Sequence, residues 1–152
     1  IFYGNRYQAQ SGSIEYSAPQ ITAFTCYRNI PCHQTCFYST DLFRERQYHT
    51  RYKVRADYEH FLWCYFQGKA RFTYVPECVV SYEGGGFSET KENERQSAKE
   101  HREITGMYMT LAQRFQYRAY LILTLAPLRH ALATNPRFAD AYNNIVKKFY
   151  HR

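Results

Sequence analysis

Apolar and polar residues alternate over residues 1–18, IFYGNRYQAQSGSIEYSA, on both sides of the small residues SGS. A period of two places successive side chains on opposite faces of a strand, and small residues favour a tight turn, so the pattern predicts a β-hairpin. The segment 21–39 is rich in aromatic and β-branched residues. It predicts an extended run that is interrupted at Pro31 and continues as a buried strand near 32–38.

A helical period begins after residue 55. Apolar residues recur at i, i+3, i+4 and i+7 from Tyr58, and Gly68 follows as a C-terminal signal, so we predict a helix over 56–67. A shorter helix is expected over 39–48, because this segment opens with Ser-Thr-Asp.

The second half of the chain predicts two strands and then helices. The segment 70–83 indicates a strand, a turn at Pro76 and a second strand. A charged helix is expected to begin after a cap at Ser88, residues 107–132 predict a long helical region, and a last amphipathic helix begins at Pro136. This order of elements predicts an α/β fold, with a hairpin and mixed strands followed by C-terminal helices.

Charge divides the chain in two. Acidic and basic residues cancel over 1–94, so the whole formal excess of +7 lies in 95–152. This distribution indicates a site in the first part and an anionic surface as the partner of the second. The five cysteines are odd in number and scattered, which argues against a disulfide framework and favours a reducing, cytoplasmic setting. No apolar run reaches the roughly 18 residues that a membrane-spanning helix needs.

Several polar residues are candidates for chemistry. Asp57 and Glu59 open the predicted helix 56–67. Acids in a first turn stabilise the positive end of the helix dipole, and the same position suits a general base, so spacing alone leaves both interpretations open. His33 and Gln34 stand beside the predicted strand, where a histidine is either structural or a ligand contact.

A glycine run and two cysteines suggest ligand sites of other kinds. The run of three glycines at 84–86 either cradles an anion or serves as a hinge. Cys32 and Cys36 have no second Cys/His pair at finger-like spacing, so no metal site is expected among these residues.

Three of these segments resemble, in their order and spacing, the C-terminal half of family 2 glycosyltransferases of the GT-A type. The segments that carry the resemblance read IFYGN, IPCHQTCFYSTDLF and VRADYEHFLWCYFQGKARFTYVPECVVSYEGGGFS. The resemblance covers roughly residues 1–90 and implies part of a GT-A catalytic domain there. Residues 91–152 would then be a basic, aromatic, helical C-terminal extension.

The resemblance also implies roles for single residues. The aspartate of the helix-start motif is the general base in similar enzymes, which points to Asp57, although Ala56 stands where many relatives have a glutamate. Glu59 would be a supporting acid near the acceptor or at the helix start, His33 and Gln34 would contact donor or acceptor, and the glycine loop would close over the nucleotide. The implied substrate-binding residues are His33, Gln34, Glu59, Glu83, Gly84, Gly85 and Gly86.

One departure from the resemblance concerns the donor. Similar enzymes bind the nucleotide-sugar and its Mg²⁺ or Mn²⁺ largely through an N-terminal half that ends in Asp-x-Asp, and no such motif occurs in these 152 residues. We therefore expect the chain to be the acceptor-side half of an inverting transferase of surface polysaccharide or glycolipid synthesis. By itself it is expected to be inactive.

The expected partners of the whole enzyme are a nucleotide-sugar donor and a hydroxyl acceptor, which a lipid could carry. The basic C-terminal helices either contact the inner face of a membrane peripherally or pack back on the domain with Lys and Arg as a solvated face. A half-domain could also form a homodimer. Two non-catalytic alternatives are a basic, aromatic module that binds nucleic acid or anionic membrane, and a dimerisation domain. Nucleic acid is the less favoured partner, because the aromatic residues repeat at core-like spacing.

Overall fold

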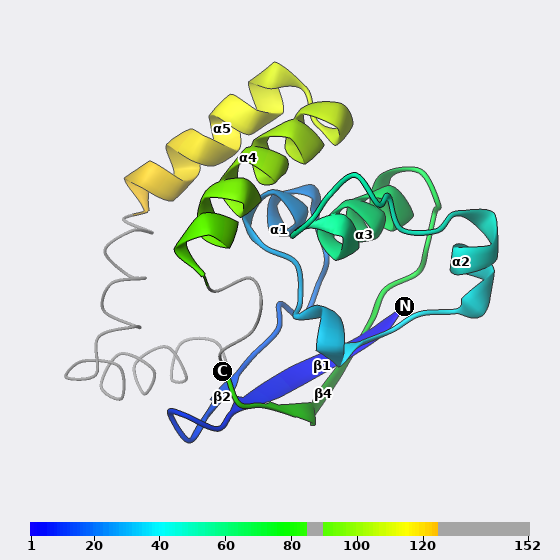
Figure 1. Ribbon diagram of the computed structural model, residues 1–152, viewed down its shortest axis with the longest axis vertical. Coiled ribbons are helices and arrows are strands. Elements are labelled where there is room, and N and C mark those ends of the chain that lie inside the picture. The colour runs from blue at the N-terminus through cyan, green and yellow to red at the C-terminus, as the bar shows by residue number, and fades with distance from the viewer. Residues whose placement is uncertain (85–89, 125–152) are drawn as a thin grey trace. The chain divides into compact units, whose positions relative to one another are not determined.

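The computed structural model describes residues 1–84 and 90–124, which form a mixed α/β structure of four strands and five α-helices (Figure 1). The prediction of an α/β fold is therefore confirmed. The chain divides into two compact units, Ile1–Thr110 and Leu111–Arg152. Helix 91–108 belongs to the first of these units, and the boundary between residues 90 and 91, which the resemblance implies, stays a prediction.

Strand β1 is the centre of the sheet, since every other strand pairs with it. The four strands are β1 (Phe2–Gln8), β2 (Ser13–Glu15), β3 (Cys36–Phe37) and β4 (Thr73–Tyr82). Strands β2 and β3 are both antiparallel to β1 and pair with its two ends, while β4 is parallel to β1 along nearly its whole length. A strand has two edges, so β2 and β3 share one edge of β1 and β4 occupies the other. The predicted hairpin is confirmed, with Gly12 at a φ of 63° in its turn.

Strand β4 runs through Pro76 without the predicted turn, so that prediction was wrong. Tyr3 pairs with Tyr74 and Asn5 with Cys78, which means that β4 carries extra residues around the proline. Proline lacks the N–H that a regular ladder needs, and a bulge in a strand with one neighbour accommodates it.

The helices differ from the predictions mainly at α1. In chain order they are α1 (Ala23–Arg28), the 3₁₀ helix η1 (His33–Thr35), α2 (Thr40–Glu45), α3 (Ala56–Phe66), α4 (Lys91–Tyr108) and α5 (Leu111–Leu123). The prediction of an extended run over α1 was wrong, because the Thr22 side chain caps a helix by accepting from the Thr25 backbone N–H at 3.1 Å. The buried strand predicted near 32–38 is only the short η1 and the two residues of β3.

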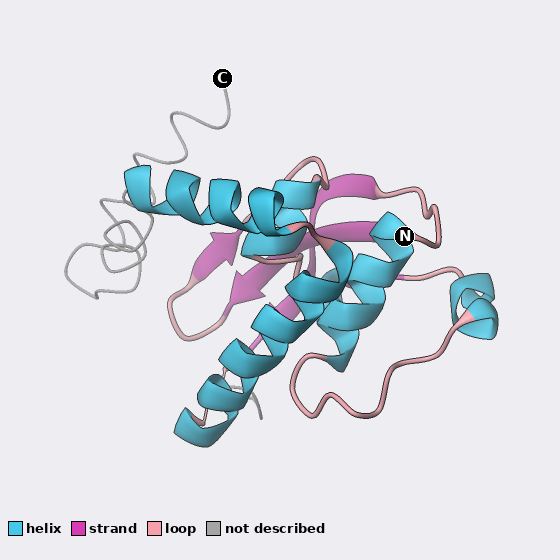
Figure 2. Ribbon diagram, turned by 90° about the horizontal axis from the view of Figure 1, so that it is seen from above, coloured by secondary structure: helices cyan, strands magenta, loops and turns pink. Residues whose placement is uncertain are grey.

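Helix α3 is the centre of the core of the first unit, and it lies on one side of the sheet (Figures 1 and 2). The prediction of a helix over 56–67 is confirmed. Every residue from Tyr58 to Cys64 is buried, and the Tyr58 hydroxyl donates to the Cys26 carbonyl oxygen of α1 at 2.6 Å. Tyr3 of β1 is also buried and supplies part of the sheet side of this core.

Helix α4 begins and ends at places that the sequence pattern did not indicate. Its cap is Thr90, which accepts from the Asn93 backbone N–H, and the predicted cap Ser88 lies outside the described residues. The long helical region predicted over 107–132 is divided, because Met109 adopts an extended conformation between α4 and α5. Residues 125–132 and the last predicted helix lie outside the described residues. Among the helices described, none is both long and apolar enough to cross a membrane.

Candidate functional site

Asp57 lies in the first turn of α3 with its carboxylate partly open to solvent. The residue before the helix, Arg55, makes no side-chain cap, and one Asp57 oxygen accepts from the Tyr58 backbone N–H at 2.8 Å. The Asp57 side chain as a whole keeps 32% of its area exposed, so the fold does not enclose it completely. The carboxylate therefore supports the helix start and still faces outward.

The structure brings His33 to Asp57. The His33 Nδ1 lies 3.3 Å from the Asp57 Oδ2, and the histidine ring is more than half exposed. The two residues come from separate segments, since His33 opens η1 and η1 packs against β1 and β4. A partly exposed carboxylate beside an imidazole is an arrangement that can hold and transfer a proton.

Gln34 and Thr35 complete the 3₁₀ turn. The Thr35 hydroxyl is buried and donates to the Cys32 carbonyl oxygen at 2.8 Å, which fixes the turn. Gln34 is exposed next to His33. The turn therefore presents His33 and Gln34 on a short rigid support.

The residues predicted to contact the nucleotide follow β4. Glu83 is exposed, and Gly84 has a φ of 81°, a left-handed conformation that favours glycine. A side chain at Gly84 would also collide with Gln10 of the hairpin turn. Gly85 and Gly86 lie outside the described residues, so the structure describes only the first two positions of this loop.

Glu59 does not join Asp57, although both open the same helix. Successive helical residues are about 100° apart, so two positions of separation turn Glu59 to nearly the opposite side of α3. There it is 1% exposed and accepts at Oε1 from Arg46 Nη2 at 2.6 Å and from the Tyr108 hydroxyl. Arg46 Nη1 also donates to the Tyr108 hydroxyl at 3.0 Å. The three side chains thus form a closed cluster, named here the Glu59 cluster.

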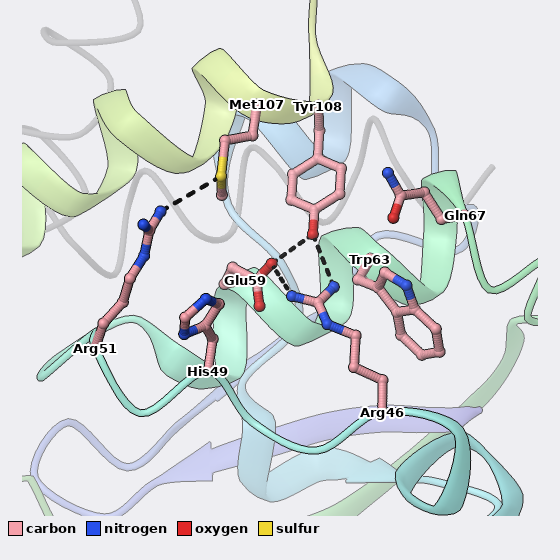
Figure 3. A pocket seen from close by; sticks show the side chains of 8 residues that line it. All are labelled: Arg46, His49, Arg51, Glu59, Trp63, Gln67, Met107 and Tyr108. Carbon is pink, nitrogen blue, oxygen red and sulfur yellow. Dashed lines mark hydrogen bonds and ion pairs between the residues drawn. The ribbon is translucent and has the colours of Figure 1, made fainter.

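A pocket of about 400 Å³ lies at the Glu59 cluster (Figure 3). Its walls come from the segment after α2, from α3 and from the end of α4, and Figure 3 labels the lining side chains. The Arg46 guanidinium lies 5.3 Å from the centre of the Trp63 ring. Since a cation is attracted to the face of an indole, this contact helps hold Arg46 at the pocket.

The electrostatics of the cluster favour a protonated Tyr108 hydroxyl and a charged Arg46. Burial, together with the hydrogen bond to Glu59, raises the pKa of Tyr108 to about 12. Burial alone would lower the pKa of Arg46, but hydrogen bonds to Tyr108 and Glu59 outweigh it and the pKa is raised. Both groups therefore keep their protons throughout the physiological range.

Sequence reasoning missed Arg46 and Tyr108. Neither belongs to a motif, and they lie far from Glu59 along the chain. The only local signal was the spacing of Glu59, Trp63 and Gln67, which share one face of α3 because they are four residues apart. That spacing indicated a shared face of the helix, but it did not indicate which residues from other segments pack on this face.

Asp57 and Glu59, the acidic pair nearest in pattern to Asp-x-Asp, do not come together. They diverge around α3, and Glu59 forms an ion pair with Arg46. No three His, Cys, Asp or Glu side chains of residues 1–84 and 90–124 gather as metal ligands do. All five cysteines are free, and burial raises the pKa of Cys26, Cys36 and Cys64 to about 12.

The two sites thus lie on different faces of one buried helix. Asp57 and His33 form a partly exposed acid–base pair at its start, and the pocket opens where Glu59, Arg46 and Tyr108 meet. Comparison of the chain with protein-family models, with curated proteins and with solved structures gave no match.

Proposed function

We propose that this chain supplies the acceptor side of an inverting glycosyltransferase of the GT-A type, with Asp57 as the general base. The observation that carries the proposal is the 3.3 Å approach of His33 to a partly exposed Asp57 carboxylate. These residues belong to two separate segments of the resemblance to family 2 glycosyltransferases, and each was assigned to the site by its motif. Their proximity is what a shared substrate site requires.

The proposed reaction is a single displacement at the anomeric carbon. The acceptor oxygen forms a bond to that carbon while the bond to the nucleoside diphosphate breaks, and the acceptor proton passes to an Asp57 oxygen. A base held within hydrogen-bond reach of the acceptor contributes on the order of 10²–10⁴ in rate. Asp57 lies in the first turn of α3, where the positive end of the helix dipole interacts favourably with an acidic side chain.

His33 would act by orienting the base. An imidazole nitrogen that donates to Asp57 Oδ2 restrains the carboxylate and leaves its exposed edge for the acceptor hydroxyl. Gln34 would contact the same substrate, and Glu83 with the glycines 84–86 would approach the nucleotide end. The donor and its divalent cation would be held by a donor-binding half that carries the Asp-x-Asp motif.

Replacement of Asp57 by asparagine tests the proposal. Asparagine keeps the size of the side chain but cannot accept a proton at physiological pH. In the protein of natural length, release of nucleoside diphosphate from a panel of nucleotide-sugars should fall about 10²- to 10⁴-fold. Binding of the donor, measured by calorimetry, should remain close to that of the unsubstituted protein.

Asp41→Asn is the matched control. Asp41 also lies in the first turn of a helix, α2, but its carboxylate pairs with the exposed Arg44 at 2.8 Å. This variant should keep both turnover and donor binding. Normal turnover by Asp57→Asn, or no donor consumption by the unsubstituted protein with any donor of the panel, would show that Asp57 is only a helix-start residue.

A further inference from the structure

We propose that the pocket at the Glu59 cluster binds a small, neutral, polyhydroxylated molecule of about the size of one sugar ring. The pocket measures about 400 Å³, which is within the range of small-molecule sites. This inference does not rest on the role of Asp57, because Glu59 and Asp57 occupy nearly opposite sides of α3. It rests on the bonding of Glu59 and on the charges around the pocket.

The first observation is a carboxylate oxygen without a hydrogen bond. Glu59 Oε1 accepts from both Arg46 and Tyr108, whereas Oε2 is buried and has no partner. Arg46 divides its two terminal nitrogens between Glu59 and Tyr108 and does not grip both carboxylate oxygens. A purely structural arginine–carboxylate pair favours the two-pronged geometry, which would have satisfied Oε2. An unsatisfied buried oxygen is costly, so a hydroxyl donor from a ligand would stabilise this arrangement.

The second observation is the charge of the walls. Arg46 is neutralised by Glu59, and Arg51 lies 2.6 Å from Glu103. An anion would have to displace a carboxylate from one of these arginines and would also face the charge of Glu59. A cation would meet two guanidinium groups. The pocket therefore favours a neutral ligand that both donates and accepts hydrogen bonds.

The remaining walls fit such a ligand. The Gln67 side chain is exposed at the pocket and offers both a donor and an acceptor, and Met107 and Trp63 supply apolar surface. A sugar-like ring has hydroxyls on its rim and C–H groups on its faces, which matches this mixture. Because Oε2 is shielded from solvent, the ligand must shift an exposed lining side chain to reach it, and His49 is one that is exposed.

Trp63 provides a direct assay, because it is the only tryptophan of the 152 residues. The unsubstituted chain is titrated with D-glucose, D-galactose, N-acetylglucosamine and myo-inositol while tryptophan emission is recorded. At least one of these neutral probes should change the emission saturably. Sodium phosphate and pyrophosphate, at matched ionic strength, should not.

Two variants separate the site from the fold. Gln67→Ala removes an exposed lining group and should weaken binding about two- to tenfold, the effect of one hydrogen bond. Gln47→Ala changes an exposed glutamine of the segment after α2 that does not line the pocket, and it should bind as the unsubstituted chain does. Glu59→Gln should weaken binding about tenfold or more, since it removes a bond to a charged acceptor. Circular dichroism confirms that each variant is folded.

Three outcomes would overturn the proposal. The first is the absence of a saturable response to any neutral probe up to its solubility limit, which would leave only ordered water in the pocket. The second is a response to phosphate or pyrophosphate in place of the neutral probes. The third is equal binding by Gln67→Ala and Gln47→Ala. None of these results bears on Asp57, whose own test is turnover.

Discussion

Glu100 of α4 holds the segment that leads into α3, and its replacement by glutamine probes that support. The Oε1 accepts from the Lys53 backbone N–H at 2.9 Å, and the Oε2 accepts from those of Val54 and Arg55 at 3.1 and 2.8 Å. Gln96 donates a fourth hydrogen bond to Oε1 at 2.8 Å. Glu100 is 2% exposed, so water cannot readily replace it.

Glutamine fits the same space but retains one acceptor oxygen. In its better orientation it keeps the bonds from Val54 and Arg55 and turns its NH₂ group toward the Lys53 N–H. One unsatisfied N–H costs about 1–3 kcal/mol, and two bonds that change from a charged to a neutral acceptor lose about 1 kcal/mol each. We therefore expect Glu100→Gln to lower the free energy of unfolding by about 3–5 kcal/mol. With a urea m-value of about 2 kcal/mol/M, the midpoint should fall by about 1.5–2.5 M.

Urea titration at pH 7, followed by circular dichroism, measures this change. The control is Glu94→Gln, an exposed acid in the first turn of α4, which should cost less than about 1 kcal/mol through the helix dipole. A loss of less than about 1 kcal/mol for Glu100→Gln would refute the hydrogen-bond argument, because it would equal the effect of a surface acid.

The pH dependence gives a second readout for the same residue. Burial alone would raise the pKa of Glu100, but the hydrogen bonds from Gln96 and from the backbone of 53–55 outweigh it, so the pKa is lowered. A lowered carboxyl pKa contributes stability that is complete above the unfolded value of about 4.3 and is lost as the pH falls through the folded value. The difference between the unsubstituted chain and Glu100→Gln should therefore shrink in acid.

Two further predictions concern the core and the sheet. Burial lowers the pKa of His60, so its contribution to stability is complete above about pH 6.5 and is lost as the pH falls through the folded pKa. His60→Phe should therefore flatten the fall in the free energy of unfolding between pH 7 and 5. An unchanged slope would assign that fall to His101, whose pKa is also lowered by burial. Gly4→Ala would place a Cβ 2.8 Å from the Glu77 carbonyl oxygen in β4 and should cost about 1–3 kcal/mol. Gly106→Ala, exposed inside α4, should instead raise the melting temperature, and changes of the same sign for the two glycines would contradict the close approach of β1 and β4.

The elements that the sequence predicted well depend on local signals. The hairpin combines alternation with a small-residue turn, and α3 combines a helical period with a glycine at its end. Helix α1 was missed because its segment is rich in residues that favour strands. The side-chain cap at Thr22 outweighs that composition, but it depends on a single residue and does not change the average over the segment. The bulge in β4 was missed because proline indicates a turn and a bulge equally well, and only the neighbouring strand decides between them.

The candidate site divides in the same way. Asp57 and His33 were assigned through motifs, and the structure places them in contact. Glu59 was assigned by its nearness to Asp57 along the chain, but helical geometry turns it to another face. The sequence did not indicate Arg46 and Tyr108 as the hydrogen-bond partners of Glu59. Each of these contacts joins segments that are separated along the chain, and neither the hydrophobic pattern nor the charge distribution predicts which residues meet.

Helix α4 connects these observations. The resemblance ends near residue 90, yet α4 supplies Glu100 to the residues before Asp57 and Tyr108 to Glu59. Ile104 of the same helix is fully buried, so α4 is part of the core that positions α3. In the proposed reaction the Asp57 carboxylate would have to meet an acceptor hydroxyl within hydrogen-bond distance, which tolerates little displacement. It follows that a helix outside the motifs fixes the geometry of both sites, and that substitutions on its buried face should alter the two sites together.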